Sequence, residues 1–318
     1  MIKSQFLKSA IKSILPQEYL QRRAAKQWYE LQKQKINSLE EAIEAIEERW
    51  EISSTQVTDN PIFLLAAGWR SGSTLIQRLV NSSGKVLMWG EPFAHSNLIQ
   101  TQAESLRIFN GQYPPESSFL DSAHFQDNQA HLSQRWTANL YSQITDLVAA
   151  HRQFWRTLYG IPANKQGYDR WGIKEVRLSI DHAIYLKWLF PKSQFIFLYR
   201  DPYKAYRSCR NWRNLYLRFP DEPVYTPEQF GWYWKNMMEG YLDGYQKVDG
   251  ILIKYEDLCS GDFPLQNLAD YLNLELDENV IGKRIGSQNK VESIPPGELK
   301  KLEQAVAPLA EKLGYTPQ

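Results

Sequence analysis

The sequence PIFLLAAGWRSGSTLIQRLVNSSGKVLMWGE, residues 61–91, contains an apolar run, a short polar loop and an amphipathic segment, in that order. The run from Ile62 to Ala67 is unbroken, which predicts a strand buried on both faces. The loop GWRSGST then leads into a predicted helix with an apolar side formed by Leu75, Ile76, Leu79 and Val80. A strand, a glycine-containing turn and a helix N-terminus together favour an anion, because first-turn N–H groups lack intrahelical acceptors and the helix dipole attracts negative charge.

The loop differs from a nucleoside-triphosphate loop in the position of its cation. In the pattern GxxxxGK[ST] a lysine directly precedes the hydroxyl residue, whereas here Ser73 and Thr74 follow Gly72 at once. The cation lies before the glycine, at Arg70, from which a guanidinium can fork onto the terminal oxygens of an anion. Because no second acid suited to magnesium accompanies this loop, the sequence predicts a phosphate-like group bound without a metal.

A second anion-binding pattern follows another apolar run far downstream. Residues 194–199, QFIFLY, predict a buried strand, and Arg200 follows it, with Ser208 eight residues later. Ser208 lies two turns into the next predicted helix, where its hydroxyl and the guanidinium of Arg200 can grip one phosphate. An ion pair between Arg200 and Asp201 is the structural alternative.

These two loops resemble the nucleotide-binding motifs of sulfotransferases that use 3′-phosphoadenosine 5′-phosphosulfate (PAPS). Their 3′-phosphate motif is similar to the pair Arg200 and Ser208, and their 5′-phosphosulfate loop is similar to Arg70-Ser71-Gly72-Ser73-Thr74. Both occur in the family's order and spacing. The resemblance implies PAPS as the sulfuryl donor, 3′-phosphoadenosine 5′-phosphate (PAP) as its product, and a P-loop NTPase-like sulfotransferase fold.

Two further segments carry the resemblance toward the C-terminus. Tyr255-Glu256-Asp257-Leu258 resembles the family's YEDL, whose tyrosine often touches the adenine. Residues 282–290, GKRIGSQNK, lie where the family wraps a loop over the 3′-phosphate and base, which implies three more donor contacts: Lys283, Arg284 and Lys290. A solvated basic face is the alternative for these three. The resemblance spans about residues 61–315.

Glu91 is the first candidate for the general base. It follows the second predicted strand, 85–89, at the edge where open α/β sheets bind ligands. The segment resembles that of tyrosylprotein sulfotransferases, in which a Gly-Glu at this distance from the loop supplies the base. A salt bridge from Glu91 to Arg70, or a cap on the following helix, is the alternative. His95 is the reserve base, since an unperturbed histidine titrates near neutrality.

Lys174 completes the predicted catalytic set of Glu91, Arg70, Lys174 and His95. It lies in GIKEVR, residues 172–177, which is similar to a segment common in bacterial sulfotransferases. The resemblance implies that its amine reaches the transferring sulfonate. A salt bridge at the strand end, to Glu175 or Glu91, is the alternative.

An insertion at about residues 95–168 is predicted to lie over the acceptor. Residues 100–128 lack a regular pattern and predict a loop or lid, whereas residues 129–159 predict one long or broken helix. Six side chains of this region are candidates for the acceptor pocket, with core packing as the alternative for most of the aromatic ones: His124, His131, Trp136, Phe154, Trp155 and Tyr159.

The composition limits the partners. Lys and Arg total 37 and Asp and Glu total 36, and this near neutrality argues against a nucleic acid as partner. The two cysteines, Cys209 and Cys259, are too few for a disulfide framework and indicate a reducing compartment, hence a cytoplasmic protein. No apolar run is long enough to span a membrane.

The N-terminal region predicts a helical extension, residues 1–58. Its first 16 residues are amphipathic and basic, which suits either a membrane surface or packing against protein. Residues 17–50 predict two helices, the second opened by a capping box of Ser38 and Glu41. Docking, oligomerisation and a lid all remain open as roles for this extension, and the sequence does not set an oligomeric state.

The predicted strands alternate with predicted helices and are too apolar for a sheet with one face in solvent. Residues 59–318 are therefore predicted to form an α/β fold of three layers, a parallel sheet flanked by helices on both faces. The predicted function is transfer of the sulfuryl group of PAPS, without a metal, to a hydroxyl or amine of a small-molecule acceptor such as a natural product. The alternatives are a P-loop kinase-like phosphotransferase and a non-catalytic nucleotide-binding scaffold protein.

Overall fold

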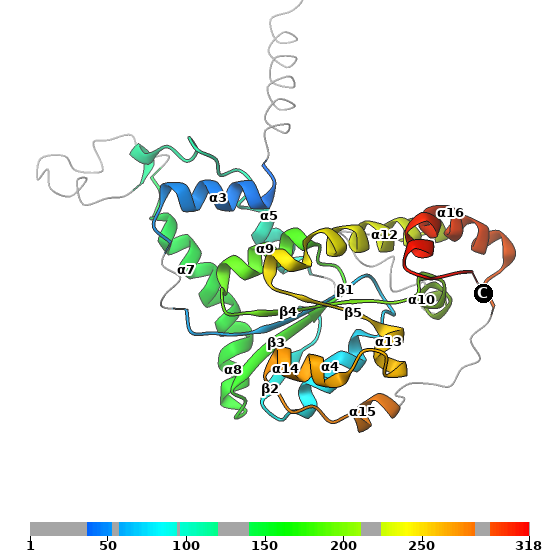
Figure 1. Cartoon of the computed structure of the whole chain (residues 1–318). Helices are drawn as coiled ribbons and strands as arrows, with labels where there is room; N and C mark the ends of the chain where they lie inside the picture. The colour runs from blue at the N-terminus through cyan, green and yellow to red at the C-terminus, as the bar shows by residue number, and fades with distance from the viewer. Residues whose placement is uncertain are drawn as a thin grey trace, which may run out of the picture.

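The apolar runs of the sequence form one parallel β-sheet in the computed structural model (Figure 1). The structure describes residues 37–52, 57–93, 96–119, 140–210, 224–283 and 293–317. The strands are β1 Ile62–Ala66, β2 Val86–Trp89, β3 Arg170–Glu175, β4 Gln194–Tyr199 and β5 Ile251–Lys254. Their spatial order is β2-β3-β1-β4-β5, and every neighbouring pair is parallel. This arrangement confirms the predicted α/β class.

Helices cover both faces of the sheet, as strands buried on both sides require. Figure 1 shows α9 and α12 above the sheet and α4, α13 and α14 below it. The helices that flank the strands are α4 Ser73–Ser82, α9 Ile180–Leu189, α10 Pro202–Cys209, α12 Pro227–Gly244, α13 Tyr255–Ser260 and α14 Leu265–Leu272. Two more close the C-terminal part, α15 Asn279–Gly282 and α16 Pro296–Lys312. The three-layer prediction is therefore confirmed.

The central strand β1 is buried along its whole length. Phe63 illustrates why, because its ring packs against three other aromatic rings at centroid distances of 5.2 to 6.2 Å: those of Trp171, Phe190 and Phe195. A side chain this enclosed contributes roughly 1.5–3 kcal/mol through burial. The loop that follows β1 thus leaves a rigid, fully enclosed strand.

Strand order places the two predicted anion motifs side by side. β1 and β4 are neighbours, yet the chain leaves β1 toward β2 and leaves β4 toward β5, on opposite sides of the pair. Such a reversal opens a crevice at the carboxyl ends of the two strands, where open α/β sheets bind ligands. The loop with Arg70 follows β1 and Arg200 follows β4 directly.

Two helical segments differ from the sequence prediction. The first is α5, Leu98–Glu104, where a loop was expected from Gln100 onward. Its local pattern is weak, but Ile99 and Ala103 lie one turn apart and are buried, so packing against α9 supports the helix.

The second difference is the length of the helix predicted to end at Tyr159. It is described from α7, Ile144–Trp155, and continues through a π-helical turn, Arg156–Gly160, into α8, Ile161–Lys165. A Cβ at Gly160 would lie 3.0 Å from Nε1 of Trp171, so the glycine marks close packing on β3 instead of a helix stop. Pro162 is tolerated because it lies in the first turn of α8.

The N-terminal extension is described from residue 37, and its helix α3, Leu39–Arg49, packs against α9. The predicted capping box is confirmed: the Glu41 N–H donates to Ser38 Oγ at 3.1 Å, and the Ser38 N–H donates to Glu41 Oε2 at 2.8 Å. The basic first 16 residues and the first predicted helix lie outside the described residues. The division at residue 58 stays a prediction, and none of the described helices is long and apolar enough to cross a membrane.

Candidate active site

The loop between β1 and α4 has the backbone of an anion cradle. Gly72 is the N-cap of α4 at φ 93°, and the N–H groups of Ser73 and Thr74 head the helix, where backbone donors have no intrahelical acceptor. Ser71 is 1% exposed, and its hydroxyl has no hydrogen-bond partner among the described residues. A buried unpaired hydroxyl is costly, so this loop retains polar groups that a ligand can satisfy.

Arg70 joins this loop to the second predicted motif. Its Nε donates to Ser208 Oγ at 2.9 Å, and its carbonyl oxygen accepts from Nη1 of Arg200 at 2.9 Å. Arg70 adopts φ 63°, a left-handed conformation that costs a non-glycine residue roughly 1–2 kcal/mol. Arg70 is therefore in direct contact with Ser208, which lies 138 positions away in the sequence, and with Arg200, which lies 130 positions away.

Tyr255 covers the same loop from α13. A Cβ added to Gly72 would lie only 2.1 Å from Cδ2 of the tyrosine, so only a glycine permits this approach. The guanidinium of Arg200 lies over the Tyr255 ring, 4.6 Å from its centroid. Three of the predicted donor-binding positions, Gly72, Arg200 and Tyr255, thus pack together.

Arg200 is held by the loop and by α13, and not through the predicted alternative, an ion pair with Asp201. Its Nε lies 3.9 Å from Oε1 of Glu256. Asp201 instead caps α10, accepting from the N–H groups of Tyr203 and Lys204, and pairs with the Lys204 amine at 3.5 Å. This cap fixes the start of the helix that carries Ser208.

Glu91 and Lys174 form an ion pair at the neighbouring strand ends. Nζ of Lys174 donates to Oε1 of Glu91 at 2.5 Å, with side chains 11% and 21% exposed, respectively. Of the predicted alternatives, the strand-end salt bridge of Lys174 is therefore present, whereas Glu91 pairs with this lysine and not with Arg70. Both groups keep some exposure, so they remain accessible to a substrate.

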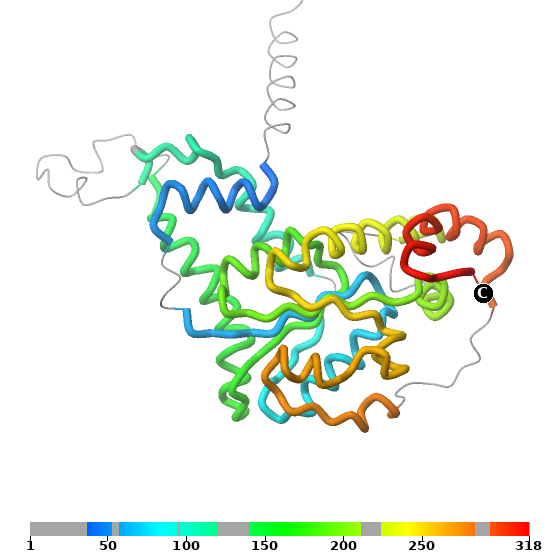
Figure 2. Tube along the Cα trace, viewed as in Figure 1, coloured from blue at the N-terminus to red at the C-terminus, as the bar shows by residue number. Residues whose placement is uncertain are grey.

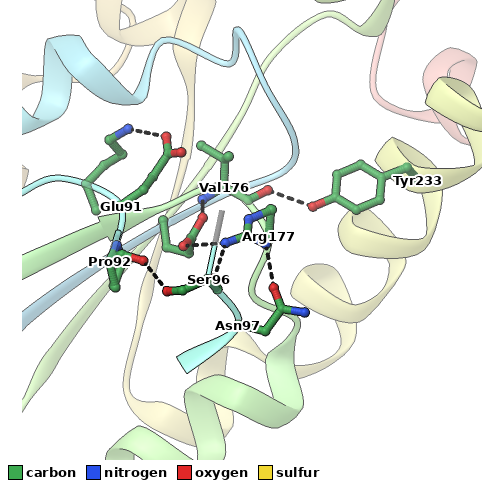
Figure 3. Close-up of polar contacts among 9 residues, drawn as sticks. Glu91, Pro92, Ser96, Asn97, Val176, Arg177 and Tyr233 are labelled. Atoms are coloured by element: carbon green, nitrogen blue, oxygen red, sulfur yellow. Dashed lines mark hydrogen bonds and ion pairs between the residues drawn. The ribbon is translucent and has the colours of Figure 1, made fainter. Parts of the chain in front are cut away.

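A buried carboxylate, Glu175, follows Lys174 at the end of β3. The pKa of Glu175 is raised to about 7: burial raises it most, the Arg177 charge lowers it, the Glu91 charge raises it, and the Val176 N–H and the Lys174 charge lower it. Arg177 approaches Oε2 of Glu175 at 3.5 Å with a side chain that is fully buried (Figure 3). Sequence reasoning missed Arg177. The sequence did contain a signal for it: in WGIKEVRL, three charged residues lie among apolar residues at the end of a strand.

The other predicted positions are less informative. Lys283 is exposed, and its carbonyl oxygen accepts from Arg78 Nη1 at 3.0 Å. Trp155 and Tyr159 are buried and stack at 6.0 Å, so for these two the core-packing alternative is right, whereas Phe154 is 38% exposed. Six candidates lie outside the described residues: His95, His124, His131, Trp136, Arg284 and Lys290.

An anion loop at the switch point of a parallel sheet places this protein in the P-loop-like α/β class. Within that class, a family model described as "Sulfotransferase family" matches residues 61–278. Since the match covers more than half of the chain, the chain belongs to the sulfotransferase family and is a sulfotransferase enzyme.

Several solved structures resemble the chain at low sequence identity. The sulfotransferase domain from the Synechococcus PCC 7002 olefin synthase is 18% identical, with a TM-score of 0.45 over 84% of this chain and 98% of its own. The sulfotransferase domain from the curacin biosynthetic pathway is 17% identical, with a TM-score of 0.46 over 82% and 99%. Mouse sulfotransferase SULT7A1 complexed with PAP is 9% identical, with a TM-score of 0.34 over 80% and 74%. Among curated proteins, none matches the chain significantly.

Proposed function

We propose that this sulfotransferase uses PAPS and transfers its sulfuryl group to a hydroxyl or amine of a small-molecule acceptor. The observation that carries the proposal is the contact between the two motifs, in which Arg70 binds Ser208 and Arg200 binds the Arg70 carbonyl oxygen. One crevice then offers anion contacts from two strand ends, which suits a nucleotide with a phosphate group at each end of its ribose.

The residues around the crevice fit such a donor. The unpaired hydroxyl of Ser71 and the helix-heading N–H groups of Ser73 and Thr74 would bind the 5′-phosphosulfate end. Arg200 and Ser208 would bind the 3′-phosphate, and Tyr255 would lie against the adenine. PAPS would supply an activated sulfuryl group, while the loop dipoles and Arg70 would stabilise the charge that develops on the transferring oxygens.

Glu91 would act as the general base toward the acceptor. A carboxylate oxygen of Glu91 would take the proton from the attacking hydroxyl or amine, which makes the acceptor a better nucleophile. Lys174, now paired with Glu91 at 2.5 Å, would orient that carboxylate and would lie within reach of the incoming sulfonate. The two groups are adjacent at the strand ends β2 and β3, beside the loop after β1.

The donor assignment is tested by binding of PAP and of adenosine 5′-phosphate, which lacks the 3′-phosphate, measured by titration calorimetry. Arg200→Ala should weaken PAP about 10- to 100-fold, the value of a charge-assisted hydrogen bond, and change adenosine 5′-phosphate far less. Arg156→Ala is the matched control, because it removes a half-exposed arginine whose partner is Asp59. Equal losses for both nucleotides would contradict the 3′-phosphate assignment.

The reaction itself is tested with radiolabelled PAPS and a panel of phenols, aliphatic alcohols, amines and tyrosine peptides. We expect transfer to a small molecule, because the chain carries no strong net charge to attract a highly charged polymer. We also expect the reaction to proceed in a chelator, since the loop lacks the lysine of the magnesium-dependent pattern. Magnesium-dependent phosphoryl transfer from ATP would favour the kinase alternative, and PAP binding without transfer to any acceptor would favour a scaffold.

A further inference from the structure

Arg177 lies just beyond β3 and donates hydrogen bonds to Ser96 and Asn97, which lie close to Glu91 in the sequence. Its Nη2 donates to the carbonyl oxygen of Ser96 at 2.8 Å, and its Nη1 donates to Oδ1 of Asn97 at 3.1 Å (Figure 3). Hydrogen bonds from a charged donor are stronger than those between neutral groups. The guanidinium therefore fixes the position of residues 96 and 97.

The held segment is tied back toward Glu91. Oγ of Ser96 donates to the carbonyl oxygen of Pro92 at 2.7 Å, and the Ser96 N–H donates to the Phe93 carbonyl oxygen at 3.2 Å. Pro92 follows Glu91 directly, so only one peptide bond separates the carboxylate-bearing residue from this anchored turn. Figure 3 shows the Glu91 ion pair and the Arg177 contacts on the two sides of the Pro92–Ser96 bond.

Arg177 is itself held rigidly. Its side chain is fully buried beside the Glu175 carboxylate, and Oη of Tyr233 donates to the carbonyl oxygen of Val176 at 2.8 Å. The Tyr233 ring stacks on Trp69 at 4.8 Å, the residue before Arg70. A single framework from α12 thus supports both the turn after β3 and the donor loop after β1.

We propose that Arg177 is a positioning residue for the general base: it anchors Ser96 and Asn97, and through Ser96 the backbone of Pro92, so that the Glu91 carboxylate stays against Lys174 and faces the acceptor. This inference rests on the proposed role of Glu91. It assigns a catalytic consequence to a buried guanidinium that a purely structural interpretation would treat as part of the core. The two interpretations differ in whether the effect of Arg177 passes through Glu91.

A double-mutant cycle with Glu91→Gln and Arg177→Lys separates them. Lysine keeps the charge but cannot make both contacts, so we expect kcat to fall about 10- to 100-fold, as for a displacement of about 1 Å, with PAP affinity unchanged. Because a displaced base matters only while the base is present, Glu91→Gln/Arg177→Lys should be no slower than Glu91→Gln alone. If the two losses multiply instead, Arg177 acts independently of Glu91 and the inference is wrong.

One control variant and one substitute variant keep the cycle decisive. Arg170→Lys alters another multiply bonded arginine on β3, at the opposite end of the strand, where it binds the carbonyl oxygens of Asn60 and Leu272; its kcat should be unchanged. If Arg177→Lys does not fold, Ser96→Ala replaces it in the same cycle, since it removes only the bond to Pro92. Full activity of Glu91→Gln alone would overturn the base assignment, an outcome distinct from multiplicative losses, which would overturn only the role of Arg177.

Discussion

At the scale of single residues, the buried Glu175 and the half-buried His182 give stability opposite dependences on pH. Glu175 has its pKa raised from 4.5 to about 7, chiefly by burial, whereas His182 has its pKa lowered from 6.5 to about 4 for the same reason. Between pH 4.5 and 7 the folded protein keeps a proton on Glu175 that the unfolded chain releases, so stability is lost as pH rises. Between pH 6.5 and 4 the unfolded chain protonates His182 first, so stability is lost as pH falls.

The variant Glu175→Gln isolates the first effect. The free energy of unfolding of the wild-type protein, measured relative to this variant by urea denaturation, should fall by roughly 2–3 kcal/mol from pH 5 to pH 8. The unaltered His182 cancels in this comparison. A difference that stays constant over the range would mean that Glu175 is already ionised at pH 5.

Sequence reasoning identified the residues of the crevice better than it identified their contacts. Arg70, Arg200 and Ser208 were predicted because each follows a strand and has a phosphate-binding side chain. That Arg70 would bind Ser208 directly was not predictable, since its side chain leaves a backbone in the left-handed region. Arg177 was missed because Glu175 was considered only as a partner of Lys174, although both lie in one run of buried charges.

At the scale of secondary structure elements, the turn from β1 to α4 depends on the approach of α13. Gly72→Ala should therefore carry two penalties, left-handed backbone at φ 93° and a collision with the Tyr255 ring. Gly84→Ala is the matched control, because Gly84 has φ 67° and open space around its missing Cβ. Differential scanning calorimetry should show a modest fall in Tm for Gly84→Ala, which carries roughly 1–2 kcal/mol of backbone strain, and a larger one for Gly72→Ala.

The same experiment separates strain from collision. Adding Tyr255→Leu to Gly72→Ala should recover part of the lost Tm, because a smaller side chain leaves room for the methyl group. Equal Tm values for Gly72→Ala and Gly84→Ala would show that the Tyr255 ring moves aside at no cost. The packing of α13 would then not constrain the turn between β1 and α4.

Elements were predictable where the apolar pattern was long and uninterrupted. Strands β1, β2 and β4 and the capping box of α3 follow from local sequence. The π-helical turn at Arg156–Gly160 does not, because the fit of Gly160 against Trp171 is a tertiary contact. The strand order is also a tertiary property, and it is this order that brings the two motifs into one crevice.

At the scale of the whole molecule, the two ends of the described chain serve different regions. Figure 2 shows α3, in blue, and α16, in red, on opposite sides of the protein. α3 buries Leu39, Ile43 and Ile46 against the domain, on the side away from α10. α16 and the residues after it lie beside the predicted donor crevice, although the family match ends at residue 278.

The C-terminal segment contacts α10, which carries Ser208, and Glu256 of α13, which lies near Arg200. Glu298 accepts from Oη of Tyr206 at 2.8 Å and from Nε of Arg210 at 2.9 Å, which ties α16 to α10. Tyr315 donates to Oε2 of Glu256 at 3.0 Å, and Oε1 of the same carboxylate lies 3.9 Å from Nε of Arg200. Residues beyond the family match thus support the positions of Ser208 and Arg200.

This arrangement predicts that Tyr315→Phe weakens PAP binding although Tyr315 lies behind Glu256. Loss of one hydrogen bond to a carboxylate frees Glu256 to shift toward Arg200 and compete with the 3′-phosphate, so we expect an increase in Kd of about 3- to 10-fold, equivalent to about 1 kcal/mol. Tyr271→Phe is the control, because its hydroxyl binds the Phe195 N–H and the Asp249 carbonyl oxygen at the opposite end of the sheet. Both variants should lower Tm, but only Tyr315→Phe should raise the Kd for PAP in titration calorimetry; equal PAP affinity in the two would limit the C-terminal segment to a role in stability.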